Sequence, residues 1–148
     1  MKRTVGWAML ALIGGLAACQ ASPRDLSLRF RSEDMEFQVL PDPVPPRARE
    51  LGGNRYRVIV RDRETKEPIE GGQGQIFATS RDGLDSYAPL EKGEELGTYY
   101  ATLHFITAGE WAMGLHFRRD STRRLERLDW MQEVFPARAE ASADSKSD

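Results

Sequence analysis

The chain alternates apolar and polar residues over several short segments. In the clearest of them, 26–31, 56–61, 99–105 and 111–118, every second residue is aliphatic or aromatic. A period of two residues is typical of β-strands that bury one face. No segment carries a sustained apolar stripe with the 3.6-residue period of a helix, so we expect few helices. A last strand is expected within 125–135.

The breaks between these segments suit an antiparallel sandwich. The polar run 62–68 is expected to turn the chain, and residues 106–110 predict a tight hairpin. In that hairpin, Phe105 and Trp111 would form the inward-facing pair. Seven or eight short strands separated by turns indicate an all-β fold, an immunoglobulin-like antiparallel β-sandwich over 26–136.

The first eighteen residues have the pattern of an export signal. Lys2 and Arg3 give a positive start, and the 15 residues that follow carry no charge. This uncharged run is shorter than the ~20 residues of a membrane-spanning helix, which favours a secretory signal peptide. It ends in Leu-Ala-Ala-Cys at 16–19, which resembles the lipobox of bacterial lipoproteins. The resemblance implies cleavage between Ala18 and Cys19 and attachment of a diacylglyceryl group to the Cys19 thiol.

These boundaries divide the chain into four parts. We expect a lipoprotein signal peptide at 1–18, a lipidated spacer at 19–25, the sandwich at 26–136 and a disordered tail at 137–148. Two or three acyl chains anchor a protein stably without a transmembrane helix. By resemblance to Gram-negative lipoproteins, Gln20 after the cysteine favours the outer membrane. The predicted location is therefore the bacterial envelope, at the outer membrane if the host is Gram-negative.

Composition narrows the possible functions. The 148 residues include 21 Lys and Arg against 23 Asp and Glu, so the chain lacks the basic excess of a nucleic-acid binder, and no nucleic-acid partner is expected. The single cysteine excludes an internal disulfide and a multi-cysteine zinc site. Removal of Lys2 and Arg3 with the signal peptide takes the formal net charge from −2 to −4.

Arginines gather on one side of a predicted strand. One side of the segment 56–61 and its turn carries Arg55, Arg57, Arg61 and Arg63. A second group follows later in the chain and comprises Arg118, Arg119, Arg123, Arg124 and Arg127. Such a side attracts anionic lipid head groups or an acidic partner, or it is an ordinary solvated face balanced by Asp and Glu. The net acidic mature chain favours the solvated face.

Histidines and methionines are the candidate metal ligands, and copper accepts both. The predicted hairpin places His104 and His116 on one sheet face but four residues apart, about 13 Å at the spacing of a strand. It points Met113 to the other face, into the core. We therefore predict no metal site and no cofactor. The alternative is copper bound by His104, His116 and Met131.

The spacing of polar residues does not indicate an active site. Neither histidine stands in a Ser-His-Asp or Cys-His pattern, and lipidation would consume Cys19. Asp82, Asp85 and Glu91 fall in a segment expected to be a polar connection. The glycine-rich run 71–74 lacks the Lys-Ser/Thr of a phosphate-binding loop. We expect no catalytic residues and no enzymatic activity.

Several short motifs resemble the YtkA-like/FixH-like domain. They lie within 39–117 and comprise Pro43-x-Pro45-Pro46, Gly53-Asn54, Pro68-Ile69-x-Gly71, Gly97-x-Tyr99 and Ala108-Gly109-Glu110-Trp111. The resemblance implies a small immunoglobulin-like module of the cell envelope. Some such domains are associated with copper handling, as CopC-like sandwiches are, or with assembly of membrane oxidases. The segment 77–90 contains no Met or His, so no ligand set carries over.

Together these patterns predict a lipid-anchored envelope protein. Its β-sandwich is expected to be a non-enzymatic binding or assembly accessory module. The expected partners are the membrane, through the lipid on Cys19, and a protein of the envelope. The alternative function is that of a periplasmic copper-handling or metal-handling protein related to FixH-like or CopC-like sandwiches.

Overall fold

The regular structure of the chain consists of β-strands. The computed structural model describes residues 25–138, so the predicted signal peptide 1–18, Cys19 and most of the spacer and tail lie outside the described residues. Nine strands and no helix occur in this range, which confirms the all-β class with more strands than the seven or eight expected. The strands are β1 (Leu28–Arg31), β2 (Met35–Asp42), β3 (Asn54–Asp62), β4 (Gln73–Ser80), β5 (Asp85–Pro89), β6 (Glu91–Lys92), β7 (Thr98–Leu103), β8 (Gly109–Arg118) and β9 (Glu126–Val134).

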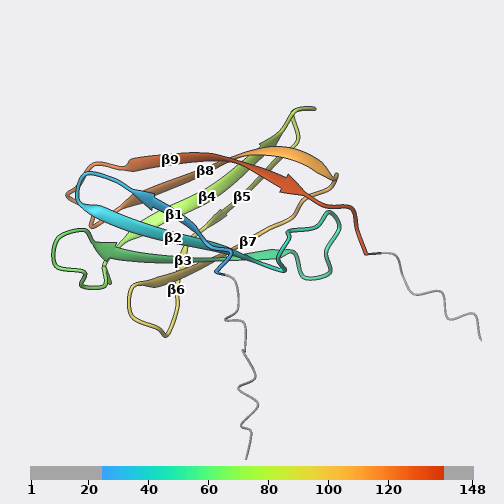
Figure 1. Ribbon diagram of the computed structural model, residues 1–148. Helices are drawn as coiled ribbons and strands as arrows, with labels where there is room; N and C mark the ends of the chain where they lie inside the picture. The colour runs from blue at the N-terminus through green and yellow to red at the C-terminus, as the bar shows by residue number, and fades with distance from the viewer. Residues whose placement is uncertain (1–24, 139–148) are drawn as a thin grey trace, which may run out of the picture.

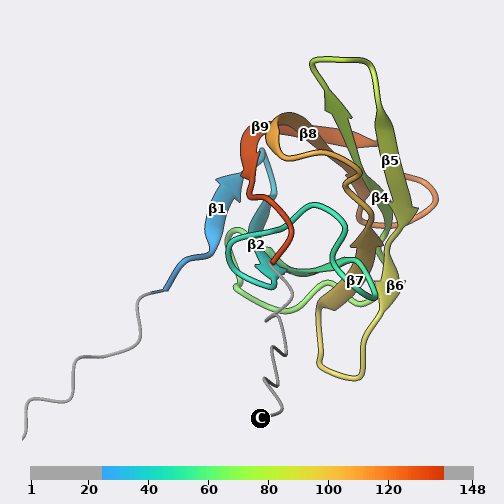
Figure 2. The ribbon, with the colours of Figure 1, turned by 90° about the vertical axis from the view of Figure 1, so that its right-hand side faces the viewer.

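The strands form two sheets that pack face to face (Figure 1). The five-stranded sheet has the order β1-β2-β3-β7-β6, and the four-stranded sheet has the order β5-β4-β8-β9. Neighbouring strands in both sheets are antiparallel. Figure 2 views the sandwich nearly end-on, with the strands of both sheets around one interior. Within 25–138, no helix is long and apolar enough to cross a bilayer.

The predicted hairpin between 99–105 and 111–117 is wrong. β7 pairs with β3 and β6, whereas β8 pairs with β4 and β9, so the segment 104–108 crosses from one sheet to the other. Phe105 and Trp111 do contact each other, with ring centroids 5.0 Å apart, but Phe105 lies in the crossing segment rather than in a strand paired with β8. A five-residue link is short enough for a hairpin or a crossing, so its length does not distinguish them.

Two regions hold strands that the alternation pattern does not predict. β2 includes Pro41, which a strand between two others would not normally accept. It is accepted here because β1 ends its pairing at Val39 and leaves Pro41 with β3 alone. The segment 82–95, expected as a polar connection, contains β5 and β6. The inward positions of β5 hold only the small residues Ser86 and Ala88, which explains why its strand pattern is weak.

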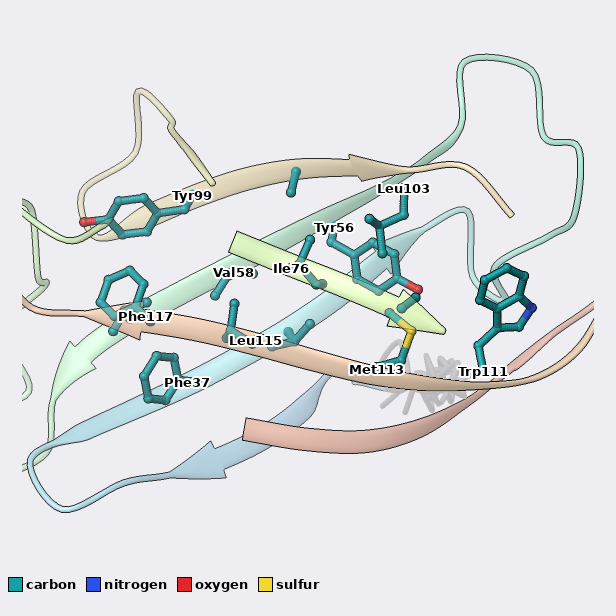
Figure 3. Packing of buried hydrophobic residues seen from close by; sticks show 14 of the residues in the cluster. Phe37, Tyr56, Val58, Ile76, Tyr99, Leu103, Trp111, Met113, Leu115 and Phe117 are labelled. Atoms are coloured by element: carbon teal, nitrogen blue, oxygen red, sulfur yellow. The ribbon is translucent and has the colours of Figure 1, made fainter. Parts of the chain in front are cut away.

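Inward-facing side chains of both sheets fill the interior (Figure 3). The apolar side of the alternating segments 99–105 and 111–118 includes Tyr99, Trp111 and Phe117, which are each 1% exposed. The Phe117 ring packs edge-on against Phe37 and Tyr99, at centroid distances of 5.6 and 5.3 Å. Full burial of a phenylalanine side chain contributes about 1.5–3 kcal/mol to folding. These aromatic side chains are therefore accounted for by the core, with no ligand required.

Two buried tyrosines differ in their hydrogen bonds. The Tyr99 hydroxyl donates to the carbonyl oxygen of Ile69 at 2.6 Å and accepts from the N–H of Gly72 at 3.0 Å. Tyr99 thus joins the β3–β4 connection to β7. Its place at the start of a strand matches the tyrosine corner of sandwich domains, although its acceptor lies 30 residues upstream rather than a few. The hydroxyl of Tyr56 has no hydrogen-bond partner among the described residues.

Candidate functional site

The structure separates the three candidate metal ligands. His104 is exposed and follows β7, where its backbone N–H donates to Ser86 Oγ at 3.0 Å. His116 is half-buried on the outer face of β8 in the other sheet. Met131 lies opposite Ala112, which is four residues, or about 13 Å, from His116 along β8. The three side chains therefore do not meet at one site.

The observed strand pairing also removes the argument by which the two histidines were placed relative to each other. The expected placement of both histidines on one sheet face is wrong, because it depended on the hairpin. Within residues 25–138, no three His, Cys, Asp or Glu side chains are grouped to hold a metal ion. Met113 is 2% exposed and belongs to the core, as predicted. The imidazole of His116 packs on Phe77, with ring centroids 4.8 Å apart.

The outer face of the four-stranded sheet combines aromatic, sulfur and cationic side chains. Inward-facing residues of β4 and β8 enter the core, so their neighbours along each strand point outward. Phe77 in β4 lies opposite Tyr87 in β5 on one side and Gly114 in β8 on the other. We call this surface the aromatic face, and its residues are Phe77, Tyr87, His116, Arg127 and Met131. All four strands of the sheet contribute to it.

Phe77 occupies the centre of the aromatic face because Gly114 has no side chain. A Cβ at Gly114 would lie 2.1 Å from Cζ of Phe77, so a larger residue would displace the ring. His116 packs against the ring, and the Arg127 guanidinium carbon lies 5.3 Å from its centroid. Asp129 holds the same guanidinium, with Oδ1 2.8 Å from Nε. These contacts fix an aromatic ring and a charge at defined positions on the surface.

Two large side chains of the aromatic face are mostly exposed to solvent and do not belong to the core. Tyr87 is 77% exposed and Met131 is 62% exposed. A groove of about 300 Å³ is lined by Phe77, Arg127 and Met131, among others. Aromatic residues, methionine and arginine are enriched in protein–protein interfaces relative to the rest of the surface. The aromatic face therefore has the composition of a binding surface.

A cluster of charged residues lies elsewhere, between the β1–β2 turn and the β8–β9 loop. Burial raises the pKa of Glu126, and the nearby carboxylate of Asp34 raises this pKa further. Arg119 pairs with Asp62 and reaches Asp34 at 3.4 Å, and its hydrogen bond lowers the pKa of the Asp62 carboxyl. These ion pairs connect the two sheets at one end. We assign them a structural role.

The aromatic face does not stand out in the sequence. The segment 82–95 was expected to be a polar connection, which hid Tyr87. Alternation around Phe77 indicated a phenylalanine on the polar side of a strand, and this was the available signal. Its significance depends on the register, because only the pairing of β4 with β8 brings Gly114 beneath the ring.

Comparison with known proteins shows similarity in fold. No family model and no curated protein sequence matches the chain. A DUF4426 family protein from Pseudomonas aeruginosa PAO1 superposes with a TM-score of 0.58 and 10% identity over 76% of this chain and 97% of that one. FetP of uropathogenic Escherichia coli strain F11 gives 0.52 and 10% over 73% and 93%. A copper-bound variant of FetP gives 0.47 and 14% over 78% and 93%. At this identity, the first two show that the chain shares their β-sandwich fold.

Proposed function

We propose that the chain is an exported, lipid-anchored protein of the bacterial envelope that binds a protein partner through the aromatic face. The lipid on Cys19 is the anchor, and the role is that of a non-enzymatic binding or assembly accessory module. One observation carries the binding role: Tyr87 and Met131, 77% and 62% exposed, flank a phenylalanine ring that His116 and Arg127 hold in place.

The aromatic face offers binding energy at low entropic cost. Burying apolar surface contributes about 25 cal/mol per Å² removed from water. Phe77 is already packed, so a partner would not have to immobilise its ring. Tyrosine supplies a large, rigid contact area with few rotatable bonds, and methionine adapts to the shape of its partner. The Arg127–Asp129 pair at the edge adds polar contacts that set orientation.

The side chains of the face support binding rather than catalysis. A general base must reach the proton that it abstracts and is usually oriented by a third group. Within 25–138, neither imidazole forms a hydrogen bond to a carboxylate, and His116 instead packs on an aromatic ring. The proposed role needs no cofactor.

Photo-cross-linking in intact cells tests the binding surface. A photoreactive amino acid at position 87 should give a discrete adduct with one envelope protein. The matched control is position 96, because Leu96 is 69% exposed but lies in the β6–β7 loop of the other sheet. The adduct at position 87 should disappear when Met131→Ala is added. Equal adducts at both positions would argue against a binding role for the aromatic face.

Cell fractionation tests the anchor separately. The unchanged protein should be processed and recovered with membranes after high-salt washing. Cys19→Ala should abolish processing at this position and the acyl modification, which mass spectrometry of the mature N-terminus detects. A Cys19→Ala protein that is processed and membrane-bound like the unchanged one would refute lipid anchoring. Either result leaves the cross-linking test of the aromatic face unaffected.

A further inference from the structure

The five-stranded sheet has an outer face of opposite character to the aromatic face. We propose that this outer face lies against the anionic lipid surface of the membrane. We call it the arginine face, and its cations are Arg29, Arg31, Arg55, Arg57 and Arg61. They occupy outward positions of β1 and β3, and four of the five are exposed. The carboxylates at outward positions of the same sheet are Glu36, Asp42 and Glu91.

Local pairing neutralises this face only in part. Asp25 pairs with Arg29 at 2.6 Å. Glu36 is shared by Arg31 and Lys66, at 3.2 and 2.8 Å, so one carboxylate faces two cations. Within the described part of the chain, no carboxylate lies within 4.0 Å of the guanidinium groups of Arg57 and Arg61. These two arginines are therefore available to an external anion.

The two outer faces carry opposite charge. The arginine face has five arginines against three carboxylates at its outward positions. Outward positions of the four-stranded sheet carry two arginines, Arg118 and Arg127, against four carboxylates. The mature chain is net acidic, so this separation of charge is a property of the fold rather than of composition. An anionic surface would attract one face and repel the other.

The chain enters the sandwich on the arginine face. Asp25 binds Arg29 at 2.6 Å, and Gln38 donates a hydrogen bond from Nε2 to Ser27 Oγ at 2.8 Å. Ser27 and Gln38 are both at outward positions, so these bonds hold the entering segment on this side of β1 and β2. Cys19 and Asp25 are six positions apart in the sequence, which limits their distance to about 20 Å. The proposed lipid anchor would thus keep the arginine face close to the bilayer.

The surface of the arginine face is shaped for small anionic groups. A hollow of about 460 Å³ is lined by Arg29, Arg31 and Arg61 together with Glu36, Gln38 and Ile59. The one carboxylate of this lining, Glu36, is already paired with Arg31 and Lys66. Three guanidinium groups around a polar amide suit the phosphates of lipid head groups, which arginine binds through paired N–H donors. The arginine face binds these phosphates collectively, as a surface rather than as a pocket for one molecule.

This orientation links the membrane to the proposed partner. The two sheets expose their outer faces in opposite directions (Figure 2). With the arginine face on the bilayer, the aromatic face is directed away from it and is open to a protein partner. This orientation depends on the proposed lipid anchor, which tethers the chain to the membrane. The separation of charge between the two faces does not depend on the anchor.

Vesicle sedimentation tests the inference without the lipid. The chain from residue 20 to residue 148 retains every described strand and the whole core, and circular dichroism checks that it and its variants are folded. At low salt, it should sediment with phosphatidylcholine vesicles that contain 30 mol% phosphatidylglycerol, and not with phosphatidylcholine alone. Near an anionic surface, each arginine contributes about fivefold to the partition coefficient. The variant Arg29→Gln/Arg57→Gln/Arg61→Gln should therefore bind about 100-fold more weakly.

A charge-matched variant provides the control. Arg81→Gln/Arg123→Gln/Arg124→Gln removes the same charge from exposed loop positions outside both faces and should retain binding within about threefold. Equal loss in the two triple variants, or equal sedimentation with neutral vesicles, would overturn the proposal. Binding to anionic vesicles combined with an unlipidated Cys19 would leave the arginine face supported and the anchor refuted. A lipidated Cys19 combined with no binding to anionic vesicles would support the anchor and refute the arginine face as a membrane-binding surface.

Discussion

Replacing Tyr99 with phenylalanine isolates one pair of hydrogen bonds in the core. The ring stays in place, so its apolar burial is unchanged. The carbonyl oxygen of Ile69 loses a donor at 2.6 Å, and the N–H of Gly72 loses an acceptor at 3.0 Å. A buried group left without a partner costs about 1–3 kcal/mol. Gly72 is half-buried and regains water in part, so we expect Tyr99→Phe to lower the free energy of unfolding by about 2 kcal/mol.

Tyr56 supplies the matched control. It is fully buried, and its hydroxyl has no partner among the described residues. Burial raises the pKa of the Tyr56 hydroxyl above its ordinary value. Removal of an unpaired buried hydroxyl relieves a desolvation cost. We expect Tyr56→Phe to change stability by less than about 0.5 kcal/mol or to increase it.

Urea unfolding followed by tryptophan fluorescence measures both variants, because Trp111 and Trp130 lie in the two strands β8 and β9. Tyr99→Phe should lower the midpoint without changing the slope, and its Tm should fall by roughly 8 °C. The reasoning would be refuted by equal losses in the two variants or by a larger loss for Tyr56→Phe.

Three further predictions follow from the register and the charges. Gly114→Ala should displace the Phe77 ring and weaken cross-linking from the aromatic face, while urea unfolding changes by about 1 kcal/mol or less. Copper titration should show no tight stoichiometric site, and the variant His104→Ala/His116→Ala should titrate like the unchanged protein. Burial raises the pKa of Glu126 above its ordinary 4.5, so this carboxyl binds its proton more tightly in the folded state than in the unfolded state. The protonated carboxyl therefore stabilises the fold at low pH, and this stabilisation is lost as the pH rises through the raised pKa. Glu126→Gln should therefore stabilise the protein at pH 7 and lose this advantage below pH 4.5, as urea unfolding at both pH values would show.

The sequence predicted the strands better than their partners. Alternation identified β3, β7 and β8, and the core positions of Tyr99 and Trp111 followed from it. It did not reveal that 104–108 crosses between sheets, because the inward parity of Phe105 is the same in a hairpin and in a crossing. Pairing between strands distant in the sequence depends on the whole fold, which local periodicity does not report.

The candidate site was harder to predict than the fold. Tyr87 belongs to a strand whose inward residues are only Ser86 and Ala88, so no alternation of large apolar residues marks it as a strand. Gly114 acquires its role only beside Phe77, which lies 37 positions away in the sequence and adjacent in register. The histidines were conspicuous in the sequence, yet the fold places them in different surroundings. The residue types alone therefore predicted the candidate site less well than the arrangement of outward-facing residues in the folded sheet.

The affinity for the cross-linked partner tests the central claim most directly. The dissociation constant should be measured by calorimetry for the unchanged protein, for Tyr87→Ala/Met131→Ala, and for the control Leu96→Ala/Leu125→Ala, in which both leucines are exposed loop residues. Truncation of interface anchors typically costs about 2 kcal/mol or more, so the first double variant should bind at least about 30-fold more weakly. The control should stay within about twofold of the unchanged protein. Affinities that are equal for both double variants would contradict the assignment of the aromatic face as the binding surface.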